Sequence, residues 1–260
     1  MSQNNRERLR KAQAAAAKQQ RMTRIIGVGA VVLVLVVIGV FVGVLVQNQG
    51  KTSTAAAGAI TPPNATMDGK AVLVNPGKFK AGAPVVELFF DYQCPVCKQF
   101  ETAYGKSLAS LADSGEIELH YRTMTFLDNN LNNDASLRAG IAATCSDVAG
   151  KYAAFHNEIY VNQPATEGGG YTDTMLRATI PSTVGITGDA LSSFQSCYDK
   201  QATKAFVTNS DDLGTQDMLA INKSVATPTM HVNGKDLPIN SIAQVAQTPE
   251  ALGALIKQHA

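Results

Sequence analysis

Two cysteines separated by two residues carry the chemistry that this sequence indicates most strongly. Cys94-Pro95-Val96-Cys97 follows the apolar run PVVELFF at 84–90, which is typical of a buried strand. From the motif to position 113, apolar side chains recur at helical spacing. The first cysteine therefore lies at the start of a helix, where unpaired N–H groups and the helix dipole favour a thiolate.

This placement assigns different roles to the two sulfur atoms. Cys94 is the expected nucleophile, and Cys97, one helical turn further on, is the expected resolving thiol. Pro95 suits the first helical turn, where its missing N–H is not needed. The alternatives are half of a zinc site and an inert disulfide. Zinc usually requires two more Cys or His ligands at close spacing, and a bridge across so short a loop stabilises little, so we favour the redox interpretation.

The other cysteines and the histidines show no second catalytic pattern. An even count of four predicts one redox pair and one further, structural pair, Cys145 and Cys197, with two buried free thiols as the alternative. The four histidines have no metal-like spacing; they are His120, His156, His231 and His259. We therefore expect neither a metal site nor a cofactor.

Strands and helices alternate around the motif in an order that predicts an α/β domain with a mixed sheet. Asn233-Gly234 is a strong two-residue hairpin signal. Gly150 is a candidate break in the longest helical stretch. The segments expected after the motif are a strand at 116–124, helices within 134–161, 172–179, 189–200 and 201–222, strands at 227–232 and 235–239, and a helix at 249–259.

The N-terminal part has the composition of a membrane anchor. Residues 25–46 are 22 uncharged, largely apolar residues, which as a helix span about 33 Å, enough to cross a bilayer. Residues 1–24 carry seven basic residues and one acidic residue, which predicts a cytoplasmic tail rather than a nucleic-acid-binding arm. Residues 47–70 resemble a flexible linker, and 71–260 form the domain outside the membrane. A cleaved signal peptide is the alternative, although the apolar run is longer than a signal peptide requires.

The segment Phe89–Cys97, with Phe100 one turn on, resembles the active site of DsbA-like thioredoxin-fold oxidoreductases, in particular the membrane-anchored Gram-positive and actinobacterial type. Thr227-Pro228, immediately before a strand, resembles the cis-proline loop of that superfamily, which contacts the redox pair and a bound peptide. The resemblance implies a thioredoxin-like mixed sheet with a helical insertion at about 128–200.

The resemblance also implies roles for further residues. It pairs Cys145 with Cys197 in a structural disulfide, which would close about 52 residues and stabilise the fold by about 4 kcal/mol in the chain-entropy model. Four residues beside the cysteines are candidates for tuning the redox pair, namely Asp91, Tyr92, Pro95 and Val96. For Asp91 and Tyr92 the alternative is that they merely end the strand. The position six before Cys94 is often acidic in the superfamily and here is Leu88, while strand alternation directs the adjacent Glu87 to the opposite face.

The implied activity is the introduction of disulfides into exported proteins with free cysteines. A membrane partner, linked to quinones in the family, would reoxidise the pair. Val96 stands where the best-known strong oxidant of the family has histidine, so we expect a milder oxidant that is still clearly oxidising. Two alternatives remain: a disulfide reductase or isomerase, and a non-catalytic module that binds clients.

Overall fold

The computed structural model describes residues 59–66, 68–74 and 76–260. The expected cytoplasmic tail, the expected membrane helix at 25–46 and the first part of the expected linker lie outside the described residues. Within the described ranges, no helix is both long enough and apolar enough to cross a bilayer.

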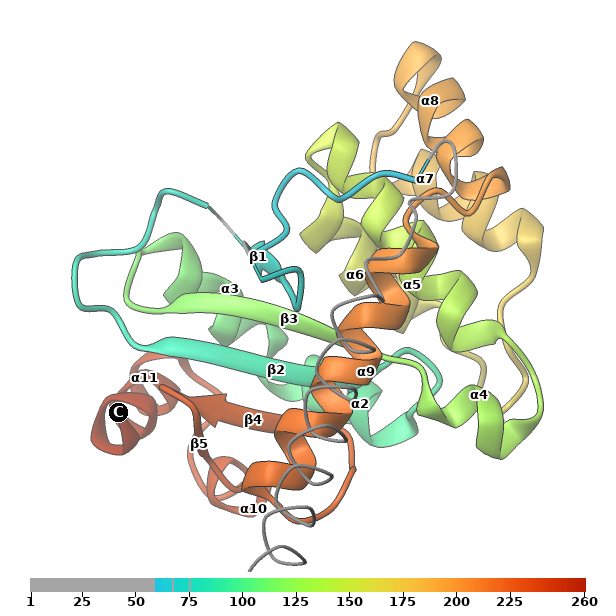
Figure 1. Cartoon of the computed structure of the whole chain (residues 1–260). Helices are drawn as coiled ribbons and strands as arrows, with labels where there is room; N and C mark the ends of the chain where they lie inside the picture. The colour runs from blue at the N-terminus through green and yellow to red at the C-terminus, as the bar shows by residue number, and fades with distance from the viewer. Residues whose placement is uncertain (1–58, 67, 75) are drawn as a thin grey trace, which may run out of the picture. The chain divides into compact units, whose positions relative to one another are not determined.

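A five-stranded mixed sheet forms the centre of the domain (Figure 1). The strands lie in the order β1-β3-β2-β4-β5, and β2 and β3 are parallel while the other neighbours are antiparallel. This arrangement confirms the predicted α/β class. The strand bounds are β1 Val72–Val74, β2 Val85–Asp91, β3 Glu118–Met124, β4 Thr229–Val232 and β5 Lys235–Asp236.

Alternation along β2 sends its side chains to two differently covered faces. Leu88 joins the main apolar core, which includes residues of α3 (Lys106–Asp113) and α11 (Pro249–His259). Phe89 faces the other way and packs with Met124 and Met218 under α9 (Lys204–Ile221). Figure 1 shows α9 lying across the sheet on this side. Gly214 permits the close approach of α9, because a Cβ there would lie 2.6 Å from the Met124 sulfur.

The helix that begins at the cysteine motif is continuous to Asp113, as predicted, but it is not uniform. It consists of α2 (Pro95–Phe100), a π-helical turn η1 (Glu101–Gly105) and α3. Such turns are uncommon and occur often at functional sites. Here the turn carries Glu101, whose side chain is only 6% exposed.

The segment between β3 and α9 forms the helical insertion, at one end of the sheet (Figure 1). Gly150, with φ of +63°, ends the first long stretch as the sequence predicts. The elements of the insertion are α4 Phe126–Leu131, α5 Ala135–Ser146, the 3-10 turn η2 Asp147–Ala149, α6 Tyr152–Val161, the π turn η3 Met175–Thr179, α7 Ile180–Thr183 and α8 Gly188–Asp199.

The structure adds elements that the sequence patterns did not predict, among them β1 and α4, and two expected segments have other bounds. Part of the expected linker contacts the domain: the Ile60 N–H donates to the Ala202 carbonyl at 2.9 Å, and the Asn64 side chain donates to Asp147 at 2.7 Å. The packed domain therefore begins before residue 71. The return strand after Asn233-Gly234 is only two residues long, because Pro238 follows it and the short helix α10 (Ile239–Ile242) begins.

Candidate active site

Cys94 is the N-cap residue of α2, with an extended backbone (φ −71°, ψ 118°). Its N–H donates to the Asp91 carbonyl at 3.0 Å, which closes a tight turn between β2 and the helix. Pro95 occupies the first helical position, and Val96 is 51% exposed beside the pair. Cys94 and Cys97 are both free thiols; Cys94 is 7% exposed and Cys97 1%. A thiol reagent therefore approaches Cys94 before Cys97.

The two thiols have opposite acidities. The pKa of Cys94 is lowered to about 6, chiefly by the hydrogen bond from the Cys97 thiol and also by the N–H groups of Cys97 and Val96. Burial raises the pKa of Cys97 well above its usual value. At neutral pH, Cys94 is thus a thiolate that accepts a hydrogen bond from a protonated Cys97, and only Cys94 is ready to exchange.

The loop before β4 meets the redox pair, although 133 residues separate them in sequence. The Thr227–Pro228 peptide bond is cis. The Thr227 carbonyl oxygen lies 3.4 Å from the Cys94 sulfur, and the Thr227 hydroxyl also lowers the pKa of Cys94. This geometry leaves main-chain groups of the loop beside the sulfur that a substrate would attack.

Asp91 directs its carboxylate away from the cysteines. Its oxygens accept from the Ser136 hydroxyl at 2.6 Å and from the Gln93 N–H at 2.8 Å, so they connect β2 to α5 of the insertion. Burial raises the pKa of Asp91 to about 7. Asp91 therefore contacts the cysteine turn twice, with its carboxylate through the Gln93 N–H and with its backbone carbonyl through the Cys94 N–H.

Tyr92 likewise places its ring in the core. The hydroxyl lies 3.1 Å from Nδ1 of His156, which belongs to α6. Nε2 of the same histidine lies 3.2 Å from Oε1 of Glu101 on the π turn, and all three side chains are buried or nearly so. The histidine therefore joins the active-site helix to the insertion.

Leu88, six residues before Cys94, is fully buried in the main core. Glu87 points to the opposite face, as alternation predicts, where it pairs with the buried Arg122 at 2.6 Å. Arg122 also lies over the Phe89 ring, 4.8 Å from its centroid. No carboxylate of β2 therefore faces the redox pair from position 87 or 88.

Three residues of the insertion contact the site without a sequence signal. The Gln163 amide donates to two carbonyl oxygens of the cysteine turn. The Tyr171 hydroxyl donates to one of the same two oxygens, and the Tyr160 hydroxyl donates to the Asp91 carbonyl. These residues follow Cys94 by 66 to 77 positions. Only the fold brings them to the site.

The second pair of cysteines forms a disulfide. Cys145 in α5 and Cys197 in α8 are bridged, with their Cα atoms 5.8 Å apart and 52 positions between them. Both are buried. The bridge therefore fastens two helices of the insertion to each other.

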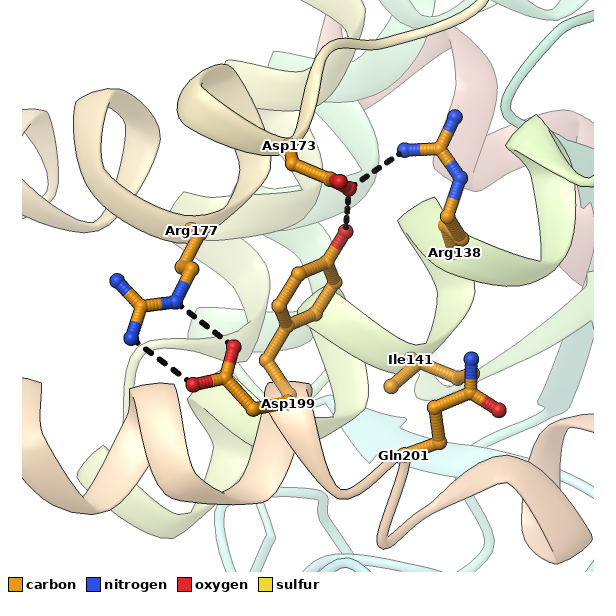
Figure 2. Close-up of a pocket in the computed structure, with 7 residues that line it drawn as sticks. Arg138, Ile141, Asp173, Arg177, Asp199 and Gln201 are labelled. Atoms are coloured by element: carbon orange, nitrogen blue, oxygen red, sulfur yellow. Dashed lines mark hydrogen bonds and ion pairs between the residues drawn. The ribbon is translucent and has the colours of Figure 1, made fainter.

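A cavity of about 280 Å³ adjoins α8 (Figure 2). Its charged groups are paired with each other: Arg177 donates twice to Asp199, at 2.7 and 2.9 Å, and Arg138 donates to Asp173 at 3.0 Å. Among the described residues, no cluster of three His, Cys, Asp or Glu side chains is arranged to hold a metal.

Residues 77–258 match the family model described as thioredoxin. The chain belongs to the thioredoxin family. Disulfide bond formation protein D of Bacillus subtilis (strain 168) is 28% identical to this thioredoxin-family chain over 162 residues, which cover 61% of the chain and 67% of the relative.

Two solved structures of Mycobacterium tuberculosis proteins extend this likeness. The reduced disulfide bond oxidoreductase DsbG is 28% identical, with a TM-score of 0.55, and the match covers 74% of this chain and 88% of that one. Oxidised DsbA is 27% identical, also with a TM-score of 0.55, over 73% and 92%. With its free Cys-x-x-Cys pair at a helix start, this member of the thioredoxin family is a DsbA-like thiol–disulfide oxidoreductase.

Proposed function

We propose that this oxidoreductase introduces disulfides into exported proteins outside the cell membrane, to which residues 25–46 anchor it. The observation that carries the direction of the reaction is the acidity of Cys94. A thiolate held by hydrogen bonds stabilises the reduced pair, and a stabilised reduced form makes the disulfide form a stronger oxidant. A reductase would instead need a disulfide form that is more stable relative to the reduced pair.

The exchange runs from an oxidised Cys94–Cys97 pair. A substrate thiolate attacks the Cys94 sulfur, the Cys94–Cys97 bond breaks, and Cys97 leaves as a thiolate that takes up a proton. A second substrate thiolate then attacks the substrate sulfur of the mixed disulfide, and Cys94 leaves as a thiolate. The substrate loses two electrons and gains a disulfide, while the enzyme gains both electrons.

The surroundings of Cys94 suit an extended substrate segment. The Thr227 carbonyl offers a main-chain acceptor beside the sulfur, and Val96 offers an exposed apolar contact. A peptide that carries a cysteine within an apolar sequence would use both groups. Reoxidation requires a separate disulfide or quinone-linked partner in the membrane.

The location outside the cytoplasm is supported by the Cys145–Cys197 disulfide, because such bonds persist mainly in oxidising compartments. A membrane-impermeant maleimide applied to intact cells tests it. After mild reduction, we expect Cys94 to be labelled without lysis. Labelling only after lysis would place the domain in the cytoplasm.

The equilibrium of the Cys94–Cys97 pair with glutathione tests the direction. We expect a potential clearly more oxidising than that of thioredoxin, which is about −270 mV. A value at or below that of thioredoxin would favour the reductase alternative. The oxidised protein should also convert a synthetic peptide with two cysteines into its disulfide form in the absence of other oxidants.

A further inference from the structure

The carbonyl groups of the cysteine turn receive hydrogen bonds from the insertion. Nε2 of Gln163 donates to the Tyr92 carbonyl at 2.8 Å and to the Cys94 carbonyl at 3.0 Å. Gln163 follows α6 directly and is 7% exposed. One amide group thus bridges the two carbonyl oxygens that flank Gln93, next to the reactive sulfur.

Two tyrosines complete the set of donors. The Tyr171 hydroxyl donates to the Tyr92 carbonyl at 2.6 Å, and the Tyr160 hydroxyl donates to the Asp91 carbonyl at 3.1 Å. Both rings are buried. Asp91, Tyr92 and Cys94 therefore each present a carbonyl oxygen to a donor that the sheet and α2 do not supply.

These donors change the electrostatic environment of Cys94. A buried carbonyl oxygen carries partial negative charge, which disfavours a nearby thiolate more than a neutral thiol. Each N–H or O–H that points at such an oxygen offsets part of that charge. The effect is strong here because little water reaches the turn.

Gln163 is itself held from both sides. Its N–H donates to the Tyr160 carbonyl at 3.2 Å, and its own carbonyl accepts from Nζ of Lys98 at 3.0 Å. Lys98 lies in α2, one turn after Cys94. The segment around Gln163 is therefore attached to the active-site helix as well as to the turn that precedes it.

We propose that Gln163 is a positioning residue of the redox pair: by donating to the Tyr92 and Cys94 carbonyls it holds the cysteine turn and stabilises the Cys94 thiolate, so that the insertion sets how oxidising the enzyme is. Tyr171, which shares one of these acceptors, assists. Only the statement that the insertion sets how oxidising the enzyme is rests on the proposed function, because the acidity of Cys94 is independent of the direction in which electrons flow.

Gln163→Leu tests the proposal, since leucine is close in size and has no donor. Gln163 acts on the thiolate through two neutral carbonyl groups, so we expect the loss of its hydrogen bonds to raise the midpoint for iodoacetamide alkylation of Cys94 by up to about one pH unit. The same loss shifts the equilibrium with glutathione up to about tenfold toward the disulfide form.

Gln195→Leu is the matched control. This glutamine lies in α8 of the same insertion, and its amide donates to the Arg177 carbonyl at 3.3 Å, within the insertion and not to the cysteine turn. We expect the alkylation midpoint and the glutathione equilibrium of this variant to equal those of the wild type. Both variants are also compared by urea unfolding.

A fall in stability without a change in the alkylation midpoint or the glutathione equilibrium would overturn the proposal and leave Gln163 a purely structural role. Tyr171→Phe keeps the test decisive if Gln163→Leu does not fold. This variant removes one donor from the Tyr92 carbonyl and should raise the midpoint by less than Gln163→Leu; an unchanged midpoint would also overturn the proposal. A reducing potential in the wild type would refute the proposed function instead.

Discussion

The chain holds two cysteine pairs whose surroundings differ. Cys94 and Cys97 are free thiols one helical turn apart, and their turn receives hydrogen bonds from main-chain and side-chain donors. Cys145 and Cys197 bridge two helices, and within the described part of the chain the Thr203 hydroxyl, 3.7 Å from the Cys145 sulfur, is the polar contact of this bridge. The hydrogen-bond donors that stabilise a thiolate are therefore what distinguishes the reactive sulfur of Cys94 from the sulfur atoms of the structural disulfide.

Cys94→Ser should have the largest effect on activity, since hydroxyl oxygen does not form the mixed disulfide. We expect oxidation of the two-cysteine peptide to fall to the uncatalysed rate. Cys97→Ser is the control, because its remaining Cys94 thiolate should attack an added disulfide such as oxidised glutathione, release one glutathione thiolate and remain as a mixed disulfide that mass spectrometry detects. Full activity in Cys94→Ser would contradict the assignment of the nucleophile.

Removing the Cys145–Cys197 disulfide should lower stability and leave activity unchanged, the reverse of what we expect for Cys94→Ser. In Cys145→Ala/Cys197→Ala, the free energy of unfolding should fall by about 4 kcal/mol, because the bridge restricts a loop of 52 residues in the unfolded chain. Urea unfolding measures the loss. The rate of peptide oxidation per folded molecule should match the wild type; a large fall would mean that the bridge also shapes the redox site.

The pH dependence of alkylation compares Cys94 with an ordinary thiol. In the folded, reduced protein the midpoint should lie near pH 6, against about 8.5 for the denatured chain. Because the folded pKa is the lower one, the thiolate stabilises the reduced fold fully above the denatured value, and this stabilisation is lost as pH falls through about 6. A folded midpoint at 8 or above would remove the basis for the proposed oxidant.

Thr227→Val should raise the pKa of Cys94, but by less than unfolding the protein does. The variant keeps the size of the side chain and removes a hydroxyl that lowers the pKa of Cys94. We expect the alkylation midpoint to rise by up to about one pH unit. Thr229→Val is a suitable control, since the Thr229 hydroxyl donates to the Ala226 carbonyl at 2.8 Å.

Arg177→Ala should have the smallest effect. Arg177 and Asp199 form a bidentate pair at the cavity of Figure 2, but both side chains are more than 40% exposed. Water screens such a pair, so its removal should leave the urea midpoint and the alkylation midpoint unchanged. A shift of the alkylation midpoint would reveal coupling between this cavity and the redox site.

Local patterns allowed much of the fold and the centre of the site to be predicted. The apolar run before Cys94 and the helical spacing after it fixed the strand-to-helix junction, because both depend on neighbours in sequence. The break at Gly150 and the turn at Asn233 likewise follow from residues that adopt positive φ.

The missed features all depend on contacts between distant residues. No pattern near Gln163 marks it as a donor to the Cys94 carbonyl, and Tyr160 and Tyr171 look like ordinary core residues. The buried approach of Glu101, on the π turn, to His156 of α6 is likewise not encoded by helical spacing. The Ser136 hydroxyl that donates to the Asp91 carboxylate also comes from a distant helix of the insertion.

The bridge between α5 and α8 makes the chain a product of thiol oxidation as well as an agent of it. Ribosomal synthesis delivers all four cysteines as thiols, so every new copy needs an oxidant to close the insertion. If the enzyme acts as proposed, an oxidised Cys94–Cys97 pair of a finished copy can accept those two electrons, after which the membrane partner must reoxidise that pair. Finished copies, supplied with that partner, should then accelerate the maturation of new ones.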